Sequence, residues 1–376
     1  MNDLSGALTW EERVTFTLRS LYARYGYQPY KMSKFEEYDL YVRNKDFLIS
    51  DSVITFTDTT GQLMALKPDV TLSIIKNTRD EGSSISKLYY NENVYRVSKS
   101  SGSFRELMQV GLECVGGIGT ADVCEVLWLA ASSLAAIRPE FVLDVSHLGL
   151  IGAVLSSVPA EAEKALLVSI GEKNPYGVAD TAREYGIDPQ AEQDLKTLAS
   201  LAGPAAEVVP KLEGIAVRYG AIDALGELKT ALSVFDGTPL CAGIRVDASV
   251  LDDMKYYNGI VFKGFLRGVP ESVLSGGQYD RLMKRMHRDS RAIGFAVYLD
   301  GLERLETDGK APRYDSDVLL LHDPDVPPAV LREVKERLIA DGLSVRSAVS
   351  RDPKIRAGRI VKLTGDSGSW EVTDLG

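Results

Sequence analysis

The sequence has few cysteines and few histidines. Of its 376 residues only Cys114, Cys124 and Cys241 are cysteines, an odd number without the spacing of metal ligands. Neither a disulfide framework nor a zinc site is indicated, and we expect buried free thiols in a reducing compartment. The three histidines are scattered with no Ser, Cys or Asp arranged around them, so we expect neither a catalytic triad nor a metal centre.

Positive charge is also scarce. Lys and Arg number 43 against 53 Asp and Glu, a formal net charge of −10. Proteins that grip phosphate backbones carry an excess of Lys and Arg, so we do not expect nucleic acid as the main partner. One basic run occurs at Arg346, Arg351, Lys354, Arg356, Arg359 and Lys362, relieved only by Asp352. Such a run is typical of a solvated face, a surface that docks on an acidic protein, or a remnant RNA contact.

Long apolar runs are missing as well. No stretch of about 18 apolar residues occurs anywhere, and the start of the chain has neither a basic n-region nor an apolar h-region. We therefore expect no membrane segment and a cytoplasmic protein. With 45% hydrophobic and 26% charged residues the composition is that of a globular chain, long enough for two or three domains.

Hydrophobic periodicity divides the first 310 residues into alternating blocks. A capping box at Thr9–Glu12 opens a predicted helix over about 10–25, which Gly26 ends. The further predictions, in chain order, are short strands of an antiparallel sheet over 27–117, a helix over 122–137, a strand over 140–145, a helix over 147–156, an inserted bundle of short helices over 158–235, strands over 242–277, and a strand running into a helix over 292–305. Strands interrupted and flanked by helices predict an α+β domain over residues 1–310.

A second, smaller domain is predicted over residues 314–376. The polar segment 306–313 is interpreted as a linker, followed by a strand over 318–321, a helix over 328–340 and a strand over 360–363. About 60 residues is small for an independent fold, so we expect this domain to pack on the first or on a partner.

One predicted strand combines a polar face with a core face. Over residues 107–115, alternation places Gln109, Gly111 and Glu113 on one face and apolar residues on the other. The Cα atoms of Gln109 and Glu113 are then roughly 13 Å apart, so these side chains could contact opposite ends of one amino acid. A solvated strand face is the alternative.

The run from Tyr95 to Glu113 resembles the motif 2 region of class II aminoacyl-tRNA synthetases of the histidyl branch. The resemblance continues, in order, at Tyr25–Tyr27 (motif 1), Leu66–Thr71, Tyr256–Phe262, Ser275–Leu282 and Ala292–Ala296 (motif 3). It covers nearly all of residues 9–305. It implies a class II synthetase-like antiparallel sheet flanked by helices, with a helical insertion, and a shortened anticodon-binding-like α/β domain at the C-terminal end.

This resemblance also implies an amino-acid pocket. Asp69 matches the carboxylate that binds the α-ammonium of histidine, and Glu113 matches the one that faces the imidazole. Thr71 and Gln109 match polar neighbours, and Tyr256 and Tyr257 match the tyrosine pair of the pocket wall. These residue types suit the ligand, since each donor nitrogen needs an acceptor and an aromatic ring packs against a flat heterocycle.

The ATP-binding half of the pattern is incomplete. Arg96 and Arg105 occupy the motif 2 arginine positions and are possible contacts for an anion or ligand. Ser98 stands where motif 2 usually has glutamate, Gly301 at the motif 3 arginine, and Asp252 at the histidyl-specific arginine. Cations arranged around the phosphates are needed to activate an amino acid, so we expect histidine to be held but not activated.

A histidyl-synthetase-like chain with a retained amino-acid pocket and degraded ATP motifs most resembles the regulatory subunits of ATP phosphoribosyltransferase. That resemblance implies no catalysis by this chain and no cofactor, and a role in the first step of L-histidine biosynthesis. The implied partner is the short-form catalytic subunit, whose activity requires this chain and which histidine inhibits through it, with a homodimer inside a larger hetero-oligomer. The alternatives are a stand-alone histidine sensor or other synthetase-derived regulator, and an unusual active histidyl-tRNA synthetase.

Overall fold

Helix α1 (Trp10–Arg24) begins at the predicted capping box. The Glu12 amide donates to Thr9 Oγ1 at 3.2 Å, and the Thr9 amide donates to Glu12 Oε2 at 2.8 Å. Val14, Leu18 and Tyr22 form its buried face. Gly26 follows with a φ of +83°, which glycine adopts without steric cost, and the chain turns there into strand β1.

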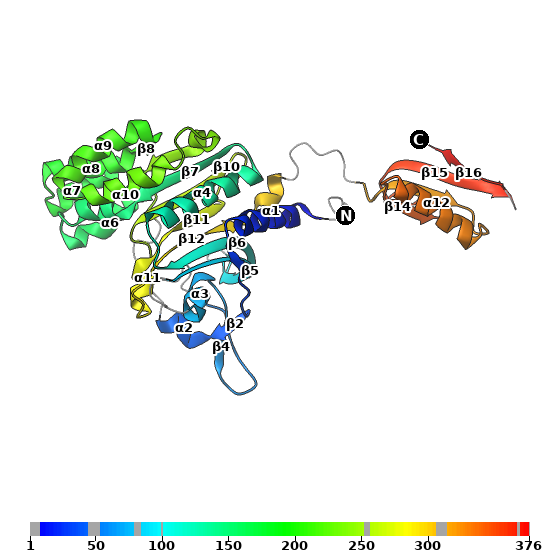
Figure 1. Ribbon diagram of the computed structural model, residues 1–376, viewed down its shortest axis with the longest axis horizontal. Coiled ribbons are helices and arrows are strands. Elements are labelled where there is room, and N and C mark those ends of the chain that lie inside the picture. Colours follow the sequence, from blue (N-terminus) through cyan, green and yellow to red (C-terminus); the bar gives the residue numbers. More distant parts are fainter. Residues whose placement is uncertain are drawn as a thin grey trace. The chain divides into compact units, whose positions relative to one another are not determined.

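The computed structural model describes residues 8–43, 53–78, 84–98, 101–251, 256–305, 314–366 and 369–375. The chain divides into two units, Met1–Leu305 and Glu306–Gly376 (Figure 1). The predicted linker, 306–313, lies outside the described residues.

A nine-stranded sheet is the framework of the first unit. In spatial order its strands are β1 (Gln28–Pro29), β5 (Ile85–Val97), β6 (Phe104–Gly116), β12 (Arg291–Tyr298), β11 (Leu274–Gln278), β10 (Ile260–Leu266), β7 (Phe141–His147), β9 (Ile244–Asp247) and β8 (Ala202–Gly203). All neighbours pair antiparallel except β1 with β5 and β7 with β9. The predicted α+β, class II synthetase-like class is confirmed, with the correction that the sheet is mixed at two of its pairings.

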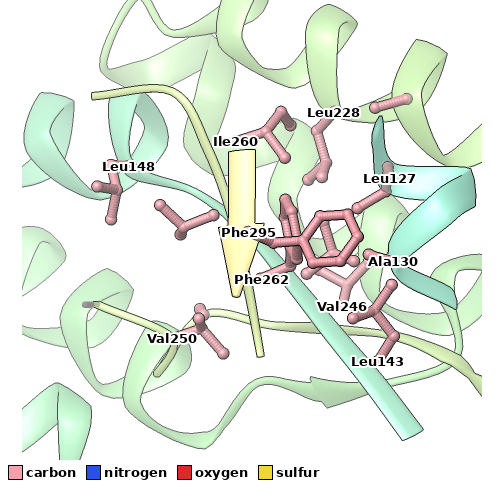
Figure 2. Packing of buried hydrophobic residues seen from close by; sticks show 14 of the residues in the cluster. Leu127, Ala130, Leu143, Leu148, Leu228, Val246, Val250, Ile260, Phe262 and Phe295 are labelled. Carbon is pink, nitrogen blue, oxygen red and sulfur yellow. The ribbon is translucent and has the colours of Figure 1, made fainter. Parts of the chain in front are cut away.

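Helices α1 and α4 (Thr120–Ile137) cover one face of this sheet. The Tyr22 and Ser133 hydroxyls join the two helices by a buried hydrogen bond of 3.0 Å. Figure 2 shows Phe262 of β10 and Phe295 of β12 among residues of α4, β7 and β9, and their ring centroids are 6.2 Å apart. Apolar residues from strand and helix therefore meet in one core.

Helix α4 bears on the expectation that no segment of the chain crosses a membrane. Within the described residues it is long and apolar enough to cross a membrane, by length and composition alone. Its Val126, Leu127, Leu129 and Leu134 are fully buried within the core of the first unit. A helix packed on several sides needs apolar residues around most of its circumference, and this accounts for its composition.

Short helices gather at the β7–β9–β8 end of the sheet, as predicted (Figure 1). They are α5 (Leu148–Leu155), α6 (Ala160–Gly171), α7 (Pro175–Tyr185), α8 (Pro189–Ser200), α9 (Ala205–Arg218) and α10 (Ile222–Ser233), followed by the 3₁₀ helix η2 (Pro239–Gly243). Two of these helices begin at clear local signals, since Asn174 caps α7 and Pro204 precedes α9. Helices α8 and α9 are joined by Asp194 and Arg218, whose Oδ1 and Nη2 are 2.6 Å apart.

The opposite face of the sheet carries smaller elements. These are helices α2 (Tyr38–Arg43), α3 (Thr71–Asn77) and α11 (Asp280–Arg285), and a three-stranded sheet of β2 (Phe35–Glu37), β4 (Leu63–Leu66) and β3 (Thr55–Thr57). Helices α2 and α3 were not predicted, because six or seven residues are too few to establish a helical period. The predicted helix after β12 is also wrong: Gly301, at a φ of +82°, leads into a 3₁₀ turn, η3 (Leu302–Leu305).

The cysteines are only partly as expected. Cys114 is buried, Cys124 is half-buried, and Cys241 is exposed, so the prediction of three buried thiols is wrong for Cys241. Cys241 lies in the short helix η2, which contributes no buried residue.

The second unit has a sheet and core of its own. Strands β13 (Ser316–His322), β14 (Val345–Ala348), β15 (Ala357–Asp366) and β16 (Ser369–Asp374) lie in the order β14-β13-β15-β16, with α12 (Pro328–Ala340) between β13 and β14 in the chain. The helix begins and ends where predicted, whereas β14 and β16 were missed. In the basic run, Arg359 pairs with Asp374 at 2.5 Å and Lys362 with Asp323 at 3.5 Å.

Candidate functional site

Glycines in three central strands make room for a cavity on the sheet face opposite α1 and α4. Gly294 of β12 lies opposite Glu113 of β6, and Gly277 of β11 lies opposite Gly294. A Cβ at Gly294 would come within 1.8 Å of Glu113 Oε2, and one at Gly111 within 2.5 Å of the Tyr90 hydroxyl. The missing side chains therefore leave space that Glu113 and Tyr90 occupy in part.

Asp69 enters the cavity from the segment before α3. Its Oδ1 accepts a hydrogen bond of 2.9 Å from the Leu72 amide, in the first turn of that helix. Burial raises the pKa of this carboxyl, and the Leu72 amide and the positive charge of Arg96 oppose the rise. Asp69 is thus a buried carboxyl fixed at a helix start, with a guanidinium nearby.

Glu113 lies on the sheet floor of the same cavity and is 2% exposed. Its Oε1 accepts a hydrogen bond from Thr71 Oγ1 at 2.8 Å, and its Oε2 accepts one from the Tyr279 hydroxyl at 2.6 Å. Burial raises its pKa to about 8, although both hydrogen bonds act in the opposite direction. Near neutral pH the carboxyl therefore holds a proton that it can share with a basic nitrogen.

Tyrosines form much of the cavity wall. The rings of Tyr256 and Tyr257 meet edge to face with centroids 4.6 Å apart, and Tyr279 lies 5.8 Å from Tyr256. Burial raises the pKa of Tyr90, Tyr256 and Tyr279 far above the usual value, so these hydroxyls stay protonated. Flat apolar faces with hydroxyl donors suit an aromatic heterocycle.

The structure brings together all six of the predicted histidine-binding residues. Asp69, Thr71, Gln109, Glu113, Tyr256 and Tyr257 line one cavity, with Arg96 beside them. Arg105 is not part of its lining: its Nη2 pairs with Asp300 Oδ2 at 3.1 Å, and both side chains are exposed. Of the two arginines predicted as possible anion or ligand contacts, Arg96 lines the cavity and Arg105 lies outside its lining; contact with an anion or ligand stays a prediction for both.

Sequence reasoning missed several lining residues. Tyr90, Ser275, Tyr279 and Tyr298 also face the cavity, and Ser275 Oγ lies 2.7 Å from the Tyr298 hydroxyl. Ser275 and Tyr279 fall within a segment that resembles the synthetases, and Tyr298 lies two residues beyond another. Tyr90 gave no such signal and is placed by its pairing with Gly111.

The cavity is narrow. The space between its lining atoms is about 390 Å³ including solvent at the mouth, but only about 30 Å³ is wide enough for the centre of a water molecule. Each water needs about 10–15 Å³ by that measure, so two or three would fit. A ligand of amino-acid size would enter only with movement of the walls.

Two of the three altered ATP positions can be placed. Ser98 follows β5 at the start of the β5–β6 turn, and Gly301 precedes η3; neither side chain is positively charged. Asp252 lies outside the described residues.

Within the described residues, no group of three or more His, Cys, Asp or Glu side chains could hold a metal ion. His147 caps α5 by accepting from the Gly149 amide at 3.1 Å.

Comparison with known proteins identifies the family of the chain. A family model for histidyl-tRNA synthetase matches residues 6–302. The ATP phosphoribosyltransferase regulatory subunit of Oceanobacillus iheyensis is 23% identical over 95% of this chain and 89% of its own length. The protein of the same name from Caldanaerobacter subterraneus is 29% identical over 75% of each chain.

Solved structures show the same fold. A structure described as an ATP phosphoribosyltransferase regulatory subunit/histidyl-tRNA synthetase from Bacillus halodurans superposes with a TM-score of 0.77 at 21% identity, covering 94% of this chain and 93% of that one. The ATP phosphoribosyl transferase (HisG:HisZ) complex from Thermotoga maritima gives 0.63 at 19% identity, covering 80% and 98%. Because the family model spans most of its length, the chain belongs to the histidyl-tRNA synthetase family, among relatives named as regulatory subunits of ATP phosphoribosyltransferase.

Proposed function

We propose that this chain is a non-catalytic regulatory subunit of ATP phosphoribosyltransferase that binds L-histidine in the cavity described above. The observation that carries the proposal is that two buried carboxyls, Asp69 and Glu113, reach one narrow tyrosine-lined cavity from different walls. Histidine has an ammonium for one carboxyl and a ring nitrogen for the other. Among the described lining residues, Arg96 is the cation available to its carboxylate.

The altered ATP positions support binding without activation. Transfer at a phosphate centre is accelerated by fixed cations directed at the developing charge. Gly301 offers no side chain at the motif 3 position, and Asp300 beside it pairs with Arg105. This pairing puts a carboxylate next to a cation that a synthetase would direct at phosphate.

Regulation would operate through a partner. The short-form catalytic subunit would require this chain for activity, and histidine would favour the inhibited arrangement of the complex by a coupling free energy of about 1–3 kcal/mol. The loops around Asp69 and around 252–258 are the parts we expect to move, because they would close on the ligand; residues 252–255 lie outside the described residues. A homodimer within a larger hetero-oligomer would carry this coupling.

Reconstitution with a short-form catalytic subunit tests the proposal. We expect the catalytic subunit to be activated by this chain and inhibited again by L-histidine. Glu113→Gln and Tyr257→Phe should raise the half-inhibitory histidine concentration about tenfold, while the concentration of chain needed for activation stays the same. Equal loss of both properties would contradict this division of roles. Histidine binding without any effect on the catalytic subunit would indicate a stand-alone sensor, and ATP-dependent formation of a histidyl adenylate would indicate a synthetase.

A further inference from the structure

A buried ion pair outside the cavity lining connects the segment that carries Asp69 to strand β5. The Lys67 side chain is 0% exposed, and its Nζ lies 2.5 Å from Glu92 Oε2. Glu92 itself is 14% exposed and accepts a weak contact of 3.4 Å from the Met32 amide through its other oxygen. A buried lysine is costly unless paired, and an apolar side chain of similar length would fill the same space at less cost.

Backbone and side-chain hydrogen bonds hold the same segment at neighbouring points. The Tyr95 amide donates to the Lys67 carbonyl at 2.9 Å, and Arg96 Nε donates to the Pro68 carbonyl at 3.3 Å. On the other side, the Lys67 amide donates to the Lys34 carbonyl at 3.1 Å. Residues 67 and 68 are therefore fixed to β5 and to the chain before β2.

The residues immediately after this attachment form one wall of the cavity. Asp69 follows Pro68 and caps α3 through the Leu72 amide, and Thr71 donates to Glu113. Val70 and Ile74 pack against Tyr90 and Val94 of β5. A shift of the Lys67 attachment along β5 would move Asp69 relative to the sheet floor, while Glu113 would stay with β6.

We propose that the Lys67–Glu92 pair is a positioning device that sets where Asp69 stands and thereby determines selectivity for ligands that carry an α-ammonium. This inference rests on the proposed function. Ligand recognition then has two parts. The position of Asp69 on the cavity wall depends on the ion pair, and the position of Glu113 on the sheet floor does not.

Titration with two ligands tests the division. L-Histidine has an ammonium, and imidazolepropionic acid is its analogue without one. In Lys67→Met we expect the preference for histidine over imidazolepropionic acid to fall about tenfold, while affinity for the analogue changes less than about twofold. The double variant Lys67→Met/Glu92→Leu, which leaves no unpaired charge, should fold at least as well and show the same lost preference. An equal loss for both ligands in either variant would overturn the proposal.

Lys173→Met is the control. Lys173, whose side chain is 50% exposed, pairs through Nζ with the buried carboxylate of Asp247 at 2.6 Å, and neither residue lines the cavity. The substitution removes the lysine that pairs with a buried carboxylate, and it should leave the preference for histidine over imidazolepropionic acid unchanged. A fall in preference as large as that of Lys67→Met would show a general effect of destabilisation.

Hydrogen exchange at the Leu72 amide provides a readout that needs no ligand. This amide donates to Asp69, so its exchange should speed up in Lys67→Met and in the milder Glu92→Gln, and stay at the wild-type rate in Lys173→Met. Unchanged protection in Lys67→Met would overturn the positioning role even if the wild-type chain bound no histidine. If Lys67→Met loses protection at the Leu72 amide but the wild-type chain binds no histidine, the proposed function is wrong and the positioning role of the ion pair stands.

Discussion

Gly294 lies directly opposite Glu113 in the antiparallel pairing of β12 with β6, and the Glu113 carboxyl occupies the space where a side chain at position 294 would stand. The absence of one methyl group thus allows a carboxyl to lie flat against the middle of a sheet. The cavity depends on this close approach as much as on its polar residues.

Gly294→Ala should displace Glu113 and weaken histidine binding about tenfold or more, since overpacking of this kind costs about 1–3 kcal/mol. Calorimetric titration and thermal unfolding would measure the two effects. Gly226→Ala is the control: this glycine lies in α10 with open space around its missing side chain, so alanine should stabilise the helix slightly and leave binding intact. Unchanged affinity in Gly294→Ala would refute the role assigned to the glycine.

Tyr279→Phe should weaken histidine binding about threefold to tenfold, because the hydrogen bond from the hydroxyl to Glu113 Oε2 is lost from a buried site. Tyr22→Phe removes a comparable buried hydrogen bond, to Ser133, on the other face of the sheet. Both variants should lose similar stability, and only the first should lose affinity. Equal affinities in the two variants would count against a role for Tyr279 in orienting Glu113.

Histidine binding should depend on pH through one shared proton. With a Glu113 pKa of about 8 in the empty cavity, the proton is already on the protein between about pH 6.5 and 8, and the neutral imidazole can receive it without net uptake. Above pH 8 the proton must be taken from solvent, so affinity should fall about tenfold per pH unit beyond the loss caused by the ligand's own ammonium. In Glu113→Gln this additional fall should vanish. Parallel profiles for the two proteins would contradict the assignment.

The same raised pKa makes Glu113 a source of instability at alkaline pH. The folded chain keeps a proton that the unfolded chain loses near pH 4.5, so this contribution to stability is complete at low pH and is lost as pH rises toward and through 8. Relative to wild type, Glu113→Gln should therefore gain about 2 kcal/mol or more in free energy of unfolding between pH 5 and pH 9. Urea unfolding at the two pH values would measure this gain. The exposed Glu184→Gln should show none, and a gain of the same size there would argue against the burial effect.

Arg96 and Arg105 should behave differently although the sequence places both in the same motif. Arg96 lies beside Asp69 in the cavity, so Arg96→Met should weaken histidine binding about tenfold. Arg105 is exposed and paired with Asp300, and Arg105→Met should change affinity less than about twofold. Similar losses would mean that the ligand extends beyond the cavity toward Arg105.

Parts of this structure could be read from sequence because local signals agreed with the tertiary fold. The Thr9–Glu12 capping box, the alternation at Gln109 to Glu113 and the Pro and Gly at the ends of α12 each follow from short-range chemistry. The six cavity residues come from three separate stretches of chain, and only the resemblance to a known family could join them before the structure was seen.

Other parts could not be predicted. Helix α3 has only seven residues, too few to show a helical period in the sequence. Its start is fixed instead by the Asp69 side chain and by packing on β5. The burial of Lys67 has no local signal, since it depends on Glu92, 25 residues away on another element. Tyr90 reaches the cavity because Gly111, opposite it on β6, leaves room for its ring.

Isothermal titration of the purified chain with L-histidine, and separately with ATP, tests whether the chain holds histidine without activating it. We expect saturable binding of histidine with no heat from ATP, and histidine binding weakened about tenfold in Glu113→Gln. Binding of ATP with the heat of histidine activation, or histidine binding that is indifferent to Glu113, would contradict this expectation.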